Sequence, residues 1–124
     1  NEYSIKVDNP NSSVLTMSGG NMQKLVVARE LSNNFPLIII ENPTWGIDVG
    51  SIAFIHQKIL DIKAKGAAIL LVSNELDEIE VLADSAVVMY EGKISKRITK
   101  DTKFRENIAS KMLSGVHFTE NING

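Results

Sequence analysis

The sequence predicts an α/β domain with a mostly parallel sheet and flanking helices. Two apolar runs, Leu37 to Ile40 and Ala67 to Ser73, have the length of strands, and residues with helical spacing precede, separate and follow them. Continuous apolar runs of this kind are typical of parallel strands that are covered on both faces. The order of the elements therefore indicates helices alternating with buried strands.

The first third of the chain contains the opening helix. Residues 2–7 alternate as a short strand does, and residues 9–13 form a loop because Pro and Asn interrupt the pattern. From Ser18 onward a helix of about four turns is expected, closing before Pro36. Its predicted apolar stripe consists of Met22, Leu25, Ala28 and Leu31, with Val26 alongside.

The remaining elements follow from the same periodicities. After a loop over residues 43–50, a second helix ends near Gly66, and its inner stripe consists of Ile52, Ile55, Ile59 and Ile62. A short acidic helix is predicted over residues 75–82, with its carboxylates on the exposed side. A third strand at 85–90, a hairpin turn at Glu91-Gly92, a polar strand at 93–99 and a helix at 102–113 complete the pattern, with a frayed tail over 115–124.

Composition limits the classes of function. The net charge of the 124 residues is -2, so a basic surface for nucleic acid is not expected. Without cysteine the chain has no disulfide framework and no thiolate zinc site. No apolar run approaches the length of a membrane span. Because the chain begins Asn1-Glu2-Tyr3, we expect residues 1–124 to be one piece of a domain in a longer protein.

A serine and two glycines, Ser18-Gly19-Gly20, open the first helix. The N-terminus of a helix presents unpaired N–H groups and the positive end of the helix dipole, which attract phosphate. Glycines there let an anion approach the backbone closely. The simpler interpretation is a capped helix after a loop, with the Ser18 hydroxyl as the cap.

The first apolar strand ends at Glu41-Asn42-Pro43-Thr44. Ligands of open α/β sheets bind beyond the carboxyl ends of the strands, and a carboxylate such as Glu41 can hold Mg²⁺ there. Taken alone, this segment is explained better as a buried strand that ends in a turn.

In this order the two motifs resemble those of the ABC-type ATPases. MSGGNMQKLVVARE is similar to the signature motif and its helix, and ENPTWGIDVGS to the Walker B end and D-loop of importers of simple sugars and nucleosides. LLVSNELDEI resembles the switch region, and SAVVMYEGKI the terminal hairpin. Such importers carry two ATPase domains in tandem, and the chain resembles the C-terminal half of the second. The resemblance implies a partial P-loop NTPase domain that lacks the Walker A half.

The chain departs from the family pattern at three catalytic positions. Glu41 and Asn42 stand where the Walker B motif has aspartate and glutamate, and Asn74 occupies the position of the switch histidine. A neutral amide cannot accept a proton from water, and general base catalysis contributes a factor of about 10² to 10⁴. We therefore expect this domain's own site to be degenerate, with Glu41 a weak Mg²⁺ candidate.

The resemblance implies a different role for the first helix. Ser18, Gly19 and Gly20 would contact the γ-phosphate of ATP that is held by the other domain, with Asn21 and Gln23 at the same end of the helix. Asp48 matches the D-loop aspartate at the interface between the domains.

The implied partners are the first nucleotide-binding domain of the same polypeptide and membrane permease subunits, at the cytoplasmic face of the plasma membrane. ATP and Mg²⁺ would serve the full-length protein. This segment lacks a Walker A loop and is expected not to bind them tightly.

In the family's sheet the Walker A strand lies between the switch strand and the strand that begins near Ala86. Unpaired strand edges invite association. We expect the gap to be closed by direct pairing of these strands, by residues 2–7, or by a second copy of the chain.

Two other functional classes remain open from the sequence. One is a soluble ABC-type switch of translation or DNA repair, and the other is a structural module without a nucleotide. The solute is expected to be a sugar or, with slight preference, a nucleoside. Trp45 stands where these importers usually carry arginine, and the sequence offers no physical account of it.

Overall fold

The computed structural model describes residues 19–31 and 35–114, and the chain divides into two compact units, residues 1–73 and 74–124. The expectations for residues 2–7, for Ser18 and for the tail over 115–124 fall outside the described residues.

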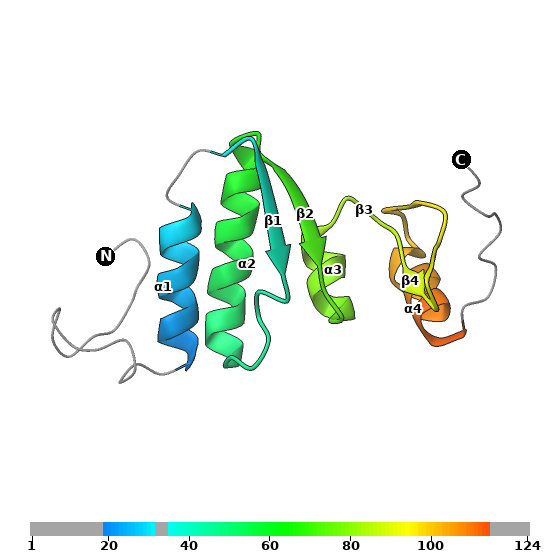
Figure 1. Cartoon of the computed structure of the whole chain (residues 1–124), viewed down its shortest axis with the longest axis horizontal. Helices are drawn as coiled ribbons and strands as arrows, with labels where there is room; N and C mark the ends of the chain where they lie inside the picture. Colours follow the sequence, from blue (N-terminus) through cyan, green and yellow to red (C-terminus); the bar gives the residue numbers. More distant parts are fainter. Residues whose placement is uncertain (1–18, 32–34, 115–124) are drawn as a thin grey trace, which may run out of the picture. The chain divides into compact units, whose positions relative to one another are not determined.

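The first unit is built from two helices and a two-stranded parallel sheet (Figure 1). Its elements are α1 (Gly19–Leu31), β1 (Leu37–Glu41), α2 (Val49–Ala64) and β2 (Ala68–Val72). The strands pair in register from Leu37 with Ala68 to Glu41 with Val72. Both helices begin at the end of the unit where β1 and β2 finish. The predicted α/β class with parallel strands is confirmed in this unit, and the expected helix and strand positions agree within a few residues.

The core of this unit lies along α2. Ile55 and Ile59 are 0% and 2% exposed, and Val27 of α1 is 8% exposed. Isoleucines at four-residue spacing lie on one face of a helix, which is why the isoleucine stripe identifies the buried face of α2 correctly.

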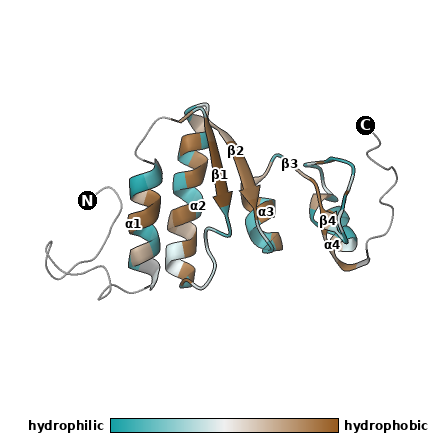
Figure 2. Ribbon diagram, viewed as in Figure 1, coloured by the Kyte–Doolittle hydropathy of each residue, from teal (hydrophilic) through white to brown (hydrophobic). Residues whose placement is uncertain are grey.

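One face of the sheet is open, contrary to the expectation that both strands are covered on both faces. Exposure alternates along β1 and β2, and Ile39 is 67% exposed. Figure 2 shows both strands as almost continuously apolar. The two strands have a side lined by α1 and α2, while their other side has no cover among residues 19–31 and 35–73.

The predicted stripe of α1 is also partly wrong. Val27, rather than Leu25 or Val26, is buried, and the latter two are exposed. Val27 follows Gln23 by one helical turn, and both residues line a groove between α1 and β1. Apolar residues occur on several sides of this helix, so the pattern of apolar letters did not identify its inner face.

The second unit contains two helices and short antiparallel ladders. Its elements are α3 (Leu76–Leu82), β3 (Ser85–Ala86), β4 (Met89–Tyr90), β5 (Lys93–Ile94), β6 (Ile98–Thr99) and α4 (Phe104–Ser114). Val88, Ile98, Phe104 and Ile108 form its buried core. The hairpin turn at Glu91-Gly92 is confirmed, with positive φ angles of 46° and 76°.

Each of the two strands expected over 85–90 and 93–99 is split in two. β3 pairs with β6 and β4 pairs with β5, with Val88 and Ser95 between the ladders. Ser95 Oγ accepts a hydrogen bond from Val88 N at 2.9 Å, and Ser95 N donates to Val88 O at 2.8 Å. The Ser95 hydroxyl accepts the hydrogen bond from Val88 N that a backbone carbonyl would accept in a regular ladder. The ladder is therefore interrupted at this pair.

The acidic helix differs from its expected pattern at one residue. Glu78 is 2% exposed, whereas the sequence predicts all the carboxylates of this segment on the outer side. Consecutive residues of a helix point in directions about 100° apart, so a run of acidic residues cannot lie entirely on one face.

Each sheet in the described part of the chain has two strands, and β2 pairs with β1. Direct pairing of β2 with the strand near Ala86 is therefore not found among these strands. The other two ways of closing the expected gap remain predictions. Within the same residues, no helix combines the length and apolarity needed to cross a membrane.

Candidate functional site

The candidate site lies at the end of the first unit where α1 begins and β1 ends. Gly19 and Gly20 start α1, and the carbonyl oxygen of Gly46 lies 4.0 Å from where a β-carbon on Gly19 would be. The loop that follows β1 therefore passes beside the opening of α1. The first amides of a helix have no partner within the helix, so this end is chemically suited to an anion.

Backbone hydrogen bonds hold the loop from Asn42 to Asp48 in place. Asn42 N donates to Val72 O at 2.8 Å, Trp45 N to Asn42 O at 3.2 Å, and Ile47 N to Thr44 O at 3.4 Å. Asn42 and Gly46 have φ angles of 43° and 73°. Asparagine and glycine adopt this left-handed region more readily than other residues, so the sequence suits the turn.

Asp48 caps the first turn of α2. Its Oδ1 accepts from Ser51 N at 3.0 Å and its Oδ2 from Ser51 Oγ at 2.7 Å. These bonds, first the one from the Ser51 hydroxyl and then the one from the Ser51 amide, lower the pKa of the Asp48 carboxyl. A β-carbon on Gly50 would lie 3.3 Å from Asp48 Oδ1, so a glycine at position 50 leaves room for the cap.

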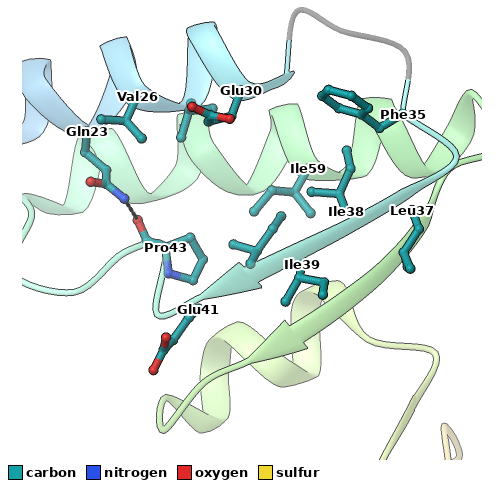
Figure 3. Close-up of a pocket in the computed structure, with 12 residues that line it drawn as sticks. Gln23, Val26, Glu30, Phe35, Leu37, Ile38, Ile39, Glu41, Pro43 and Ile59 are labelled. Carbon is teal, nitrogen blue, oxygen red and sulfur yellow. Dashed lines mark hydrogen bonds between the residues drawn. The ribbon is translucent and has the colours of Figure 1, made fainter.

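Gln23 joins α1 to the loop. Its Nε2 donates to the carbonyl oxygen of Pro43 at 2.8 Å, across twenty residues of sequence (Figure 3). Asn21, which lies closer to the start of α1, is half-buried. The structure thus brings Gly19, Gly20, Asn21, Gln23 and Asp48 to one end of the first unit.

The three positions that the sequence predicts to be degenerate are divided between the units. Glu41 is exposed at the end of β1, and Asn42 is half-buried immediately after it. Asn74 is the first residue of the second unit and lies in the bend before α3. Ser18 precedes the described residues.

The residues present do not make a metal site by themselves. No group of three or more potential ligands of the His, Cys, Asp and Glu types forms among the described residues. At the end of β1, Glu41 supplies a carboxylate and Asn42 an amide, whereas Mg²⁺ requires near-octahedral oxygen ligation.

The groove between α1 and β1 is not suited to a nucleotide. Its volume is about 470 Å³, and its lining is mainly aliphatic, with Phe35, Ile38, Ile40 and Ile59 among the residues. Its charged lining residues are the carboxylates Glu30 and Glu41, which would repel a triphosphate. Figure 3 shows the groove running along β1, with Gln23 and Pro43 at one end and Phe35 at the other.

Two contacts of the site were missed by the sequence analysis. The Asp48 cap had a detectable signal, because aspartate is one of the residues preferred immediately before the first residue of a helix. The Gln23 to Pro43 bond has no local signal, because its partners become neighbours only through folding. Trp45 is 83% exposed on the loop between them.

Known proteins with similar sequences are transport ATP-binding proteins. The chain is 40% identical over 114 residues to the ribose import ATP-binding protein RbsA of Caldanaerobacter subterraneus, covering 92% of the chain and 23% of that protein. It is 48% identical to a putative carbohydrate transport ATP-binding protein of Mycoplasma pneumoniae, covering 77% of the chain and 17% of that protein. It is 37% identical to the nucleoside import ATP-binding protein NupA of Lactococcus lactis, with shares of 83% and 20%. The chain thus spans about a fifth of the length of these relatives. No protein-family model matches it.

Solved structures give the same result. An ATP-binding subunit of an ABC transporter matches with a TM-score of 0.65 and 31% identity, covering 77% of the chain and 40% of that structure. A nucleotide-free ATP-binding cassette matches with a TM-score of 0.66 and 28% identity, covering 77% of the chain and 37% of that structure. The fold is therefore part of an ABC ATPase domain. Together these similarities show that the chain belongs to the ATP-binding proteins of the ABC transporter family, and that its relatives there are sugar and nucleoside importers.

Proposed function

We propose that the chain is part of the ATP-binding subunit of an importer for sugars or nucleosides, and that α1 completes an ATP site held by a partner domain. The observation that supports this most is the exposed glycine start of α1 beside the loop after β1. Backbone amides at this end can hold phosphate oxygens without a competing side chain. The whole subunit would couple ATP hydrolysis to import.

The same proposal assigns a degenerate site to this domain. Asn42 can orient a water molecule by a hydrogen bond, but it cannot accept a proton at neutral pH. Asn74 likewise offers an amide in place of a titratable imidazole. Glu41 retains a carboxylate, but it belongs to no group of three or more His, Cys, Asp or Glu ligands among the described residues. ATP on this domain would be hydrolysed slowly or not at all.

The partners follow from this assignment. We infer that the first nucleotide-binding domain of the same polypeptide carries the competent ATP and its Mg²⁺, with α1 and Asp48 facing it. The subunit would bind membrane permease subunits at the cytoplasmic face of the plasma membrane. Nucleic acid is not an expected partner, because the net charge is -2. Relatives of similar identity include both ribose and nucleoside importers, so the solute class is proposed at that level.

The experiment compares two substitutions in the full-length subunit assembled with its permease. Ser18→Arg places a bulky group at the phosphate-facing end of α1, and we expect it to reduce ATP-driven uptake at least about a hundredfold. Asn42→Glu restores the family residue at the degenerate site, and we expect uptake to stay within about twofold. Asn42 has a φ of 43°, so the Glu variant is strained by about 1 kcal/mol, and its folding is checked by thermal unfolding.

Normal uptake by Ser18→Arg would refute the role of α1 in a partner's ATP site. A large gain in ATPase rate with Asn42→Glu would show that Asn42 alone disables this domain's own site, and it would refute the expectation that Glu41 and Asn74 also limit it.

A further inference from the structure

The bond between Gln23 and Pro43 connects two elements that the proposed function assigns to different ATP sites. Gln23 lies in the first turns of α1, which serves the partner's nucleotide, and Pro43 follows Glu41 and Asn42 of this domain's own site. Figure 3 shows the Gln23 side chain directed from α1 towards the loop. The amide nitrogen is thus engaged within the unit at 2.8 Å.

The acceptor of this bond is the carbonyl oxygen of Pro43. Proline has no N–H group, so the carbonyl oxygen is the only hydrogen-bonding group that the backbone of Pro43 offers. Pro43 is a buried residue. A buried carbonyl that loses its donor is left with the full cost of its desolvation. The bond therefore restrains the position of α1 relative to the loop.

The loop on the other side of this bond is already held in shape. Backbone hydrogen bonds join Asn42 to Val72 and Trp45 to Asn42, and the Asp48 cap joins the loop to α2. A shift of α1 along the unit therefore has to stretch the Gln23 to Pro43 bond, because the loop cannot follow freely.

We propose that Gln23 is a positioning residue, which holds the glycine start of α1 in register with the loop from Asn42 to Asp48. The two then meet the partner domain as one rigid surface, and the bond links the state of this domain's own site to the partner's ATP. This inference rests on the proposed function of α1. It differs from the role that the resemblance implies for Gln23, a direct contact with the nucleotide.

The two roles of Gln23 predict different kinetics. A direct contact with ATP contributes to binding, so its loss raises the KM for ATP. A positioning bond acts when the two domains close on nucleotide that is already bound, so its loss lowers kcat with little change in KM.

The test uses the full-length subunit assembled with its permease. Gln23→Met removes the donor with little change in side-chain length or helix propensity, and Gln23→Lys restores a donor that reaches the carbonyl. Gln57→Met is the matched control, because Gln57 of α2 donates to Asp61 Oδ1 at 2.8 Å on an exposed helix face of the same unit. ATPase kcat, the KM for ATP and the thermal midpoint are measured for each variant.

We expect Gln23→Met to lower kcat about tenfold with KM within about twofold of wild type, and Gln23→Lys to restore at least about half of the lost rate. Gln57→Met should match wild type in both constants. A tenfold rise in KM with unchanged kcat would overturn the inference in favour of a direct nucleotide contact. A Gln23→Met variant that behaves as Gln57→Met does would also overturn it.

Ser18→Arg separates this inference from the proposed function. If Ser18→Arg abolishes transport while Gln23→Met is silent, only the positioning role fails. If Ser18→Arg transports normally, the role of α1 itself fails.

Discussion

Single residues of the site have structural tasks that their family positions do not reveal. The proposed function places Asp48 at the interface with the partner domain, and in this chain its two carboxylate oxygens accept from the amide and hydroxyl of Ser51. Asn42, which the proposed function places at a degenerate catalytic position, adopts a φ of 43° at which asparagine is tolerated better than glutamate. The bonds from Ser51 therefore favour aspartate at position 48, and the backbone conformation favours asparagine at position 42.

The Asp48 cap predicts a pH dependence of stability. Hydrogen bonds from Ser51 favour the charged carboxylate and lower its pKa in the folded state. The cap's contribution is thus complete above the unfolded pKa, about 3.9, and is lost as the pH falls through the lower folded value. Asp48→Asn retains a capping oxygen that does not titrate. In urea unfolding between about pH 5 and pH 3, the stability advantage of wild type over Asp48→Asn should shrink as the pH falls.

Ser51→Ala provides the control for this titration, because it removes the hydroxyl that is the main cause of the lowered pKa of Asp48. The free energy of unfolding of Ser51→Ala is compared with that of the double variant Ser51→Ala, Asp48→Asn. Their difference should change less with pH than the difference between wild type and Asp48→Asn. An advantage of wild type that grows at low pH would contradict the assignment of the cap.

At the scale of elements, α2 holds the first unit together. Its isoleucines at positions 55 and 59 are the most buried side chains among the described residues of the unit, and Ile59 lines the groove between α1 and β1. The loop that carries the site begins at the end of β1 and finishes at the cap of α2, so the packing of α2 also positions the site.

Truncating the buried face of α2 should therefore be costly. Ile55→Ala leaves a cavity at a side chain that is 0% exposed, and we expect it to lower the free energy of unfolding by about 2–5 kcal/mol. Val49→Ala, in the same helix at an 83% exposed position, should change it by less than about 0.5 kcal/mol. Urea denaturation followed by circular dichroism measures both, and equal effects would mean that α2 does not pack as described.

At the scale of the whole molecule, one side of β1 and β2 has no cover among residues 19–31 and 35–73 of the first unit. The open side of β1 and β2 exposes Leu37, Ile39, Leu70 and Val72. A two-stranded sheet with an apolar open face is marginal in water and tends to associate. The chain aligns with about a fifth of the length of its relatives, so those proteins have further segments that can cover the corresponding face.

The 124-residue chain on its own should therefore self-associate. We expect its weight-average mass in sedimentation equilibrium to rise above the monomer mass as concentration increases. Ile39→Lys combined with Leu70→Lys places two charges on the open face and should shift the equilibrium towards monomer. A wild-type chain that stays monomeric at all concentrations would contradict the association through this sheet.

The sequence by itself determined the α/β class, the positions of most helices and strands, the hairpin turn and the membership in the ABC family, because periodicity, turn residues and contiguous motifs are local properties. Tertiary structure alone decided that Val27 of α1 faces the core, that Glu78 is buried and that one side of the sheet is open. It also decided that Gln23 binds Pro43, twenty residues away. These features depend on contacts between residues that are distant in the sequence, so no local pattern of residues predicts them.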